Sequence, residues 1–220
     1  MNDLENLMSE VQKCVDKDKR IKKEQFQHEE RFNVFSVLNL RTDEARTHSA
    51  FLAELLDPHG SHGCGVELLR IFLKKCGLPD FSEEDLRKAY VIAEYYIGSV
   101  DDEEGGGWTA ILIQLENWTV IIENKIYYGD LSCKILNYHE FTGSDPMVKI
   151  FFLTLDGHEA SLDSTGGKLK AGEDYFLMSY KKDIRDFIQE SEHVAIQRPL
   201  VRETLIQYEN LIKELTSQDM

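Results

Sequence analysis

The sequence lacks several features that would assign it to a particular class of protein. No apolar run approaches the ~20 residues of a membrane-spanning helix, and the N-terminus is acidic without the apolar core of a secretory signal. Cysteine is scarce, and the four cysteines show no C-x-x-C spacing and no disulfide framework. We therefore expect no association with a membrane and a location in the reducing cytoplasm.

Positive charge is also in short supply. The chain has 25 Lys and Arg against 40 Asp and Glu, which gives a formal net charge of -15. Proteins that coat nucleic acid rely on clustered Lys and Arg, so this balance argues against a general coating protein. It still allows an enzyme whose carboxylates hold metal and whose basic residues are local. It equally allows a protein that binds a basic partner.

The length, the composition and the pattern of apolar residues together indicate one α/β domain with a substantial core. The 220 residues are 42% hydrophobic and 30% charged, as in ordinary globular proteins. Apolar spacing over residues 3–38 predicts a helical arm, 1–40, that packs on a domain spanning 41–220. We expect helices near 42–56, 66–76, 82–88, 130–141, 181–192 and from 198 onward, strands at 90–98, 111–115, 118–122, 149–155 and 175–179, and polar loops at 99–107 and 156–172. This order predicts a mixed β-sheet flanked by helices.

The centre of the chain is the segment 108–125. Two runs of β-branched and aromatic residues, separated by Glu116 and Asn117, predict a β-hairpin with a two-residue turn. Glu123 and Lys125 end the second run, and residues two apart on a strand point to the same face. Buried charges are costly unless they are paired or bind metal. The two residues therefore indicate either an ordinary ion pair at a strand end or a functional site.

The loop after the second expected helix is rich in glycine and histidine. His48, His59, His62 and Cys64 can be combined into a zinc site on paper, but their spacing matches no standard zinc motif. The favoured interpretation is a glycine-rich turn that leads into the next helix.

Three segments together resemble the PD-(D/E)XK nuclease superfamily. They are, in chain order, E-x-x-x-H-S-x-F-L with L-L-D-P and H-G at 44–63, I-E-N-K at 122–125, and a helix at 129–138 similar to D-Q-x-x-Q-L-x-x-Y. The resemblance covers about residues 33–155 and is fairly specific because all three segments occur in this order. It implies a restriction-endonuclease-like α/β core, and it is strongest for bacterial members found near defence and mobile loci.

The resemblance implies a metal-dependent phosphodiester hydrolase that uses Mg²⁺ or Mn²⁺. In that interpretation Glu123 is a metal ligand, and Glu44 and Glu94 are candidates to complete the metal site. Lys125 is the catalytic lysine, which orients the attacking water and offsets charge on the phosphate.

Three further residues are candidates for binding substrate, namely Lys134, His48 and Tyr138. The partner implied by the resemblance is nucleic acid, with DNA favoured over RNA, and the implied role is defence against phage or plasmids. A homodimer or a protein partner is left open.

The position that departs most from the resemblance is Ala110. The family's hairpin begins with a pattern such as R-I-D-I-L-I, whereas this chain has Trp108, Thr109 and Ala110 before Ile111. The residue expected to be a metal-binding Asp is therefore an alanine, which has no ligand atom. We expect severely weakened Mg²⁺ binding and an inactive chain.

Two explanations for this alanine compete. It is either an engineered Asp→Ala substitution in an active parent or a feature of a natural pseudo-nuclease. The retained Glu44, Glu123 and Lys125 favour the first, whereas Leu131 and Lys134 stand where the family has glutamines and favour the second. We favour the engineered origin.

Other classes of function compete with the nuclease. The chain can be a catalytically dead interaction module that uses its acidic surface and the arm at 3–38 to bind a protein. A weaker alternative is an inhibitor that mimics the charge of nucleic acid.

Overall fold

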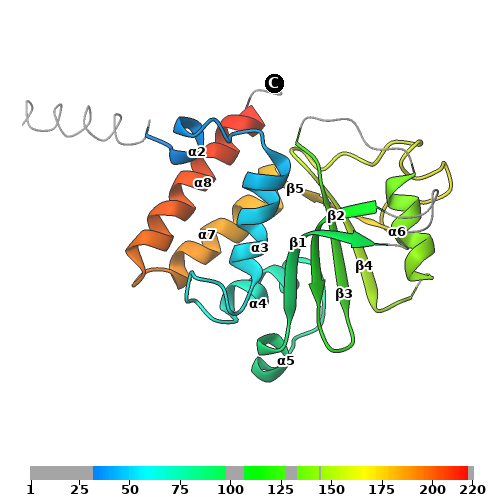
Figure 1. The fold of residues 1–220 in the computed structure, drawn as a ribbon, viewed down its shortest axis with the longest axis horizontal. Coiled ribbons are helices and arrows are strands. Elements are labelled where there is room, and N and C mark those ends of the chain that lie inside the picture. The colour runs from blue at the N-terminus through cyan, green and yellow to red at the C-terminus, as the bar shows by residue number, and fades with distance from the viewer. Residues whose placement is uncertain (1–31, 98–106, 127–132, 144, 218–220) are drawn as a thin grey trace, which may run out of the picture.

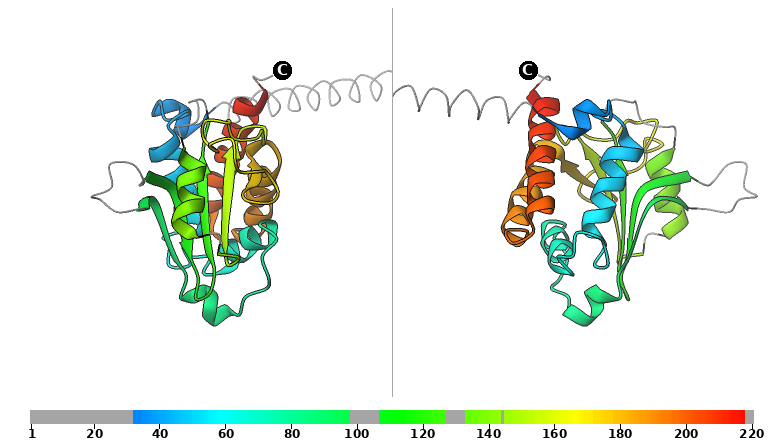
Figure 2. Two further views of the ribbon diagram at one scale, coloured as in Figure 1. Left: turned by 90° about the vertical axis from the view of Figure 1, so that its right-hand side faces the viewer. Right: turned by 60° about the vertical axis from the view of Figure 1, so that its left-hand side comes forward.

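The computed structural model describes residues 32–97, 107–126, 133–143 and 145–217. A five-stranded sheet forms its middle layer, with a group of helices on one face and α6 on the other (Figure 1). Figure 2 shows the same layers from two further directions. The expected loop at 99–107 and most of the expected arm fall outside the described residues, so the division at residue 40 stays a prediction.

The sheet is mixed, as the sequence predicts. Its strands lie in chain order, and they are β1 (Tyr90–Ile97), β2 (Gly107–Gln114), β3 (Thr119–Asn124), β4 (Val148–Thr154) and β5 (Phe176–Ser179). The β1–β2 and β2–β3 pairs are antiparallel, and the β3–β4 and β4–β5 pairs are parallel. The tight turn at Glu116 and Asn117 is confirmed, since the Leu115 N–H donates to the Trp118 carbonyl at 2.8 Å.

Most of the helices begin close to the positions expected from the sequence. They are α2 (Val34–Val37), η1 (Glu44–Ser49), α3 (Ala50–Leu56), α4 (Glu67–Lys75), α5 (Glu83–Arg87), α6 (Lys134–Thr142), η2 (Tyr180–Ile184), α7 (Arg185–Val194) and α8 (Pro199–Ser217). Asp43 caps η1 by accepting from the Arg46 N–H, and Ser82 caps α5 by accepting from the Asp85 N–H. Among the described residues, no helix combines the length and the apolar character needed to cross a membrane.

Two of the expected α-helices begin with a π-helical turn. In η1 the Asp43 carbonyl accepts from both the Thr47 and the His48 N–H groups, at 3.2 and 3.3 Å. The segment η2 leads into α7 in the same way. Such wide turns are frequent at functional sites, and η1 carries Glu44.

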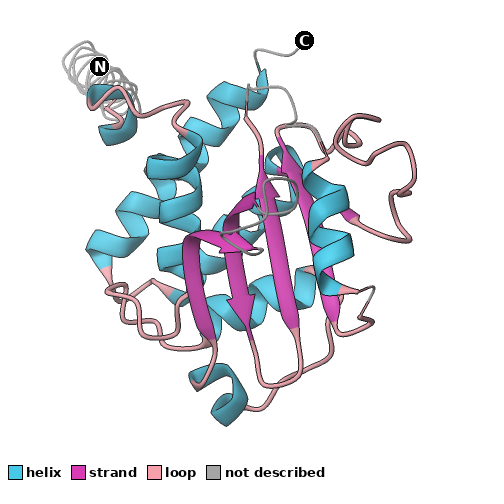
Figure 3. Ribbon diagram, turned by 45° about the vertical axis from the view of Figure 1, so that its right-hand side comes forward, coloured by secondary structure: helices cyan, strands magenta, loops and turns pink. Residues whose placement is uncertain are grey.

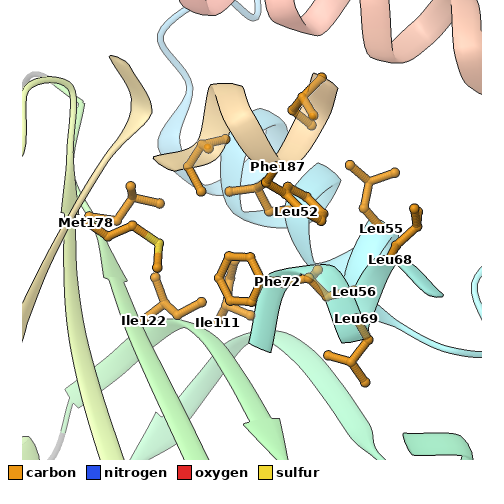
Figure 4. Close-up of a cluster of buried hydrophobic side chains, with 14 of the residues drawn as sticks. Leu52, Leu55, Leu56, Leu68, Leu69, Phe72, Ile111, Ile122, Met178 and Phe187 are labelled. Atoms are coloured by element: carbon orange, nitrogen blue, oxygen red, sulfur yellow. The ribbon is translucent and has the colours of Figure 1, made fainter. Parts of the chain in front are cut away.

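The larger core lies between the sheet and α3, α4, α7 and α8. Figure 4 shows Ile111 and Ile122 of the sheet facing Phe72 and the leucines of α3. A smaller core, which includes Leu112 and Ile121, lies on the other face beneath α6. Because both faces of β2 and β3 are buried, their sequences are apolar almost throughout rather than alternating.

Candidate functional site

Glu123 lies near the end of β3, just past the last residue that pairs with β2. The final β2–β3 pair joins Ile111 to Ile122. Ala110 and Glu123 each lie one residue beyond this pair, at the open end of the hairpin. Ala110 packs in the larger core with Ile111, whereas the Glu123 carboxylate accepts from Tyr138 of the smaller core.

Glu94 lies at a similar level on a third strand. The pairs Ala93–Ile111 and Tyr95–Thr109 flank Glu94 and Ala110, which are not themselves recorded as a pair. Its backbone adopts φ 54, a left-handed conformation that is uncommon for residues other than glycine and is often found at functional sites. Burial raises the pKa of the Glu94 carboxyl, and Lys134 and Lys125 oppose that rise. Glu94, Ala110 and Glu123 therefore lie at similar levels of β1, β2 and β3.

The Glu123 carboxylate is buried, with 3% of the side chain exposed, and both of its oxygens are engaged. Its Oε2 accepts a hydrogen bond from the Tyr138 hydroxyl at 2.8 Å. Its Oε1 lies 3.3 Å from the Lys134 Nζ and 3.7 Å from the Lys125 Nζ. Burial raises the pKa of Glu123, and the two ammonium groups and the phenol counteract this rise. Lys134 and Tyr138 come from α6, which covers this face of the sheet (Figure 3).

Glu44 joins the site from η1. Its Oε2 lies 3.7 Å from the Lys125 Nζ, and its Oε1 accepts a hydrogen bond from the Ile126 N–H at 2.7 Å. Lys125 therefore lies between two carboxylates, those of Glu44 and Glu123. The structure brings these three residues together with Lys134, although they come from segments far apart in the sequence.

A second polar cluster occupies the opposite face of the same strand end. The Asn124 Nδ2 donates to the Ser49 Oγ at 3.0 Å, and its Oδ1 accepts from the Tyr180 hydroxyl at 2.9 Å. These bonds tie β3 to both η1 and η2. This cluster was not predicted from the sequence, although an amide such as Asn124 in an apolar strand requires partners and is the signal that could have revealed it.

His48, expected to bind substrate, is fully buried in the structure. Its Nε2 lies 3.0 Å from the Arg41 carbonyl oxygen and its Nδ1 lies 2.9 Å from the Tyr208 hydroxyl. Desolvation lowers the pKa of His48, and a carbonyl only accepts, so the neutral ring carries its proton on Nε2. His48 thus links η1 to α8 and to the turn before η1.

Tyr138, also expected to bind substrate, is 1% exposed and is directed at Glu123. Neither Tyr138 nor His48 presents its side chain to solvent. Direct contact with substrate stays a prediction for Lys134, His48 and Tyr138. In this structure each of them contacts protein groups instead.

The alternative zinc site does not assemble in the structure. The His59 Nε2 lies 2.8 Å from the Arg87 carbonyl oxygen, and the His62 Nε2 lies 2.9 Å from the Asp57 carbonyl oxygen. The second ring nitrogen of His62 accepts from the Cys64 N–H at 3.0 Å. Within the described parts of the chain, no group of three or more His, Cys, Asp or Glu is arranged to hold a metal.

The residues at the strand ends do not form a magnesium site either. Mg²⁺ requires oxygen ligands at about 2.0–2.1 Å in octahedral geometry. Ala110 offers no oxygen, and the oxygens of Glu123 already face two ammonium groups and a phenol. As the chain stands, these residues do not fit a divalent cation.

Comparison with known proteins identifies a family for most of the chain. The model of a family described as the PD-(D/E)XK nuclease superfamily matches residues 32–213. The matched stretch includes η1, the three antiparallel strands, α6 and most of α8. Searches among curated proteins and among solved structures gave no match.

Proposed function

The chain belongs to the PD-(D/E)XK nuclease superfamily, and we propose that it is a metal-dependent phosphodiester hydrolase of this type whose activity is lost through Ala110. The observation that carries this proposal is the grouping of Glu123, Lys125 and Glu44 at the strand end where Ala110 also lies. A carboxylate at position 110 would be the further ligand that Mg²⁺ or Mn²⁺ needs there.

Lys125 is the proposed catalytic lysine. Its ammonium lies 3.7 Å from both Glu123 and Glu44, and its side chain is 13% exposed. An ammonium held in a largely buried site is well placed to offset the negative charge that develops on a phosphate during hydrolysis. The proposed substrate is nucleic acid, and DNA is favoured. A role in bacterial defence is suggested by the resemblance and stays a prediction.

A catalytically dead interaction module is the second candidate. It is favoured by the complete pairing of Glu123, which finds its counter-charges and a hydrogen-bond donor in Lys125, Lys134 and Tyr138. A carboxylate so satisfied by its own chain needs no metal. In this case the nuclease fold is retained as a scaffold for binding a protein.

A cleavage assay separates the two candidates. Plasmid DNA and total RNA are incubated with Mg²⁺ or Mn²⁺ and with the present chain, Ala110→Asp, or Ala110→Asp combined with Lys125→Ala. We expect cleavage by the Ala110→Asp chain alone. Ala110→Asn is the matched control, because it has nearly the size of Asp without the charge.

The opposite result is equally clear. If folded Ala110→Asp neither binds metal nor cleaves either nucleic acid even at a high metal concentration, the nuclease proposal is wrong and the interaction module is favoured. Circular dichroism of each variant shows whether it is folded. Cleavage by the present chain would show instead that Ala110 does not inactivate it.

A further inference from the structure

We propose that Lys134 is a built-in cation that opposes the binding of a divalent metal at Glu123. This inference rests on the proposed function, because it concerns the same carboxylate. It predicts that a carboxylate restored at position 110 binds metal tightly only when Lys134 is also replaced. With Lys134 in place, the Ala110→Asp chain should need a high metal concentration.

The first argument is the position of the Lys134 ammonium. Its Nζ lies 3.3 Å from the Glu123 Oε1, closer than the Lys125 Nζ at 3.7 Å. Lys125 is also paired with Glu44, so its charge is shared between two carboxylates. A metal that used the Glu123 Oε1 would meet the Lys134 charge directly. With 87% of the lysine side chain covered, solvent would screen this repulsion poorly.

The second argument is that helix stability does not explain a lysine at this place. Lys134 is the first residue of α6, where the helix dipole disfavours a positive charge. The preceding Cys133 has φ 54, an uncommon conformation for a residue other than glycine. Lys134 and Tyr138 are four residues apart on one face of α6, and both reach Glu123. The start of α6 is therefore arranged around this carboxylate.

The third argument is that Ala110 and Lys134 affect metal binding in the same direction. Ala110 offers no carboxylate at the open end of the hairpin, and Lys134 places a positive group on the carboxylate of Glu123. Both features reduce the affinity for a divalent cation. The buried Glu123 is thus neutralised by its own chain in a way that does not depend on metal.

The test measures the binding of Mn²⁺ through the electron paramagnetic resonance of the free ion. The chains compared are the present one, Lys134→Gln, Ala110→Asp, the double variant Ala110→Asp with Lys134→Gln, and Ala110→Asp with Lys134→Arg. We expect the double variant with Gln to bind at least about tenfold more tightly than Ala110→Asp, a factor equal to about 1.4 kcal/mol. The variant with Arg keeps the charge and should resemble Ala110→Asp.

Two further variants serve as a control and as a replacement for a variant that does not fold. Lys75→Gln, made in the Ala110→Asp background, removes a lysine that pairs with Glu190 at 2.7 Å on the α4–α7 surface, and it should leave Mn²⁺ binding unchanged. If Lys134→Gln fails to fold in either background, Lys134→Met removes the same charge while keeping the packing of the aliphatic chain. Thermal unfolding with and without Mn²⁺ supplies a second readout, since a bound ion stabilises the folded state.

Three results overturn the inference. They are equal Mn²⁺ affinity with and without the Lys134 charge, an Arg variant that binds as tightly as the Gln variant, and an equal gain from Lys75→Gln. Cleavage is scored separately. Tighter Mn²⁺ binding without cleavage supports the role of Lys134 and contradicts the nuclease proposal, whereas cleavage that is indifferent to Lys134 contradicts this inference alone.

Discussion

The two faces of the end of β3 hold opposite kinds of polar structure. Glu123 and Asn124 are adjacent in sequence and buried, with 3% and 2% exposed, and they point to opposite faces of the sheet. On the first face, Glu123 meets two lysines and a phenol. On the second, Asn124 meets two hydroxyl groups, those of Ser49 and Tyr180. We call these the ionic face and the neutral face.

The two faces differ in how much their polar contacts are expected to stabilise the fold. Neutral hydrogen bonds between buried groups stabilise a protein modestly once every partner is satisfied. Burying ions carries a desolvation cost that pairing often does not fully offset. The raised pKa of Glu123 reflects this cost. We therefore assign the neutral face to folding and the ionic face to function.

Breaking the neutral face should have the largest effect on stability. Asn124→Ala removes one hydrogen-bond partner from each of the Ser49 and Tyr180 hydroxyls, which would remain buried. We expect the free energy of unfolding in urea to fall by about 2–4 kcal/mol, because each unsatisfied group costs about 1–3 kcal/mol. Tyr180→Phe leaves Asn124 in place and should cost less. A loss below about 1 kcal/mol for Asn124→Ala would contradict the assignment.

Stability should also depend on pH through His48, whose ring lies 5.4 Å from the Tyr180 ring of the neutral face. Desolvation lowers the pKa of His48 below 6.5 in the folded chain, so below that pH the unfolded chain binds a proton that the folded chain does not. Stability is therefore full above pH 6.5 and is lost as the pH falls toward the folded pKa. The loss approaches about 1.4 kcal/mol per pH unit.

Comparing urea unfolding at pH 7.5 and pH 5.5 tests the contribution of His48. His48→Gln keeps an N–H group near the Arg41 carbonyl but cannot be protonated in this range. Its stability should change less than that of the present chain between the two pH values. Equal losses in both chains would show that His48 does not titrate as its burial implies.

The sequence predicted those parts of this comparison that depend on local pattern. Alternation along an extended strand placed Glu123 and Lys125 on one face, and their side chains do lie 3.7 Å apart. Turn chemistry predicted the hairpin, and the helix expected near 42–56 does begin there, with Asp43 as its cap. The π-helical turn that follows was not predicted, because apolar spacing does not distinguish it from an α-helix.

The parts that were missed depend on distance through space. The Asn124–Ser49 and Tyr180–Asn124 bonds join residues 75 and 56 positions apart, and no local pattern reports such contacts. Lys134 was expected to contact substrate. The sequence does not show how α6 packs against β3, so the contact with Glu123 was not predicted. Only the folded arrangement shows that its ammonium reaches Glu123 at 3.3 Å.

Removing the ionic face should have the smallest effect on stability. This result would most clearly distinguish the contributions of the two faces. The double variant Glu123→Gln with Lys134→Met deletes the closer ion pair while roughly keeping its volume, and Lys125 retains Glu44 as a partner. We expect the free energy of unfolding to stay within about 1 kcal/mol of the present chain or to rise, because replacing a buried ion pair by uncharged groups is often neutral or stabilising.

The surface pair of Lys75 and Glu190 provides the reference for this double variant. Lys75→Met with Glu190→Gln should change stability by no more than about 1 kcal/mol, as for other exposed pairs. If the ionic double variant loses more than about 2 kcal/mol while this control does not, Glu123 and Lys134 hold the fold together. The ionic face would then have a structural reason to exist, and its retention could no longer be taken as a sign of function.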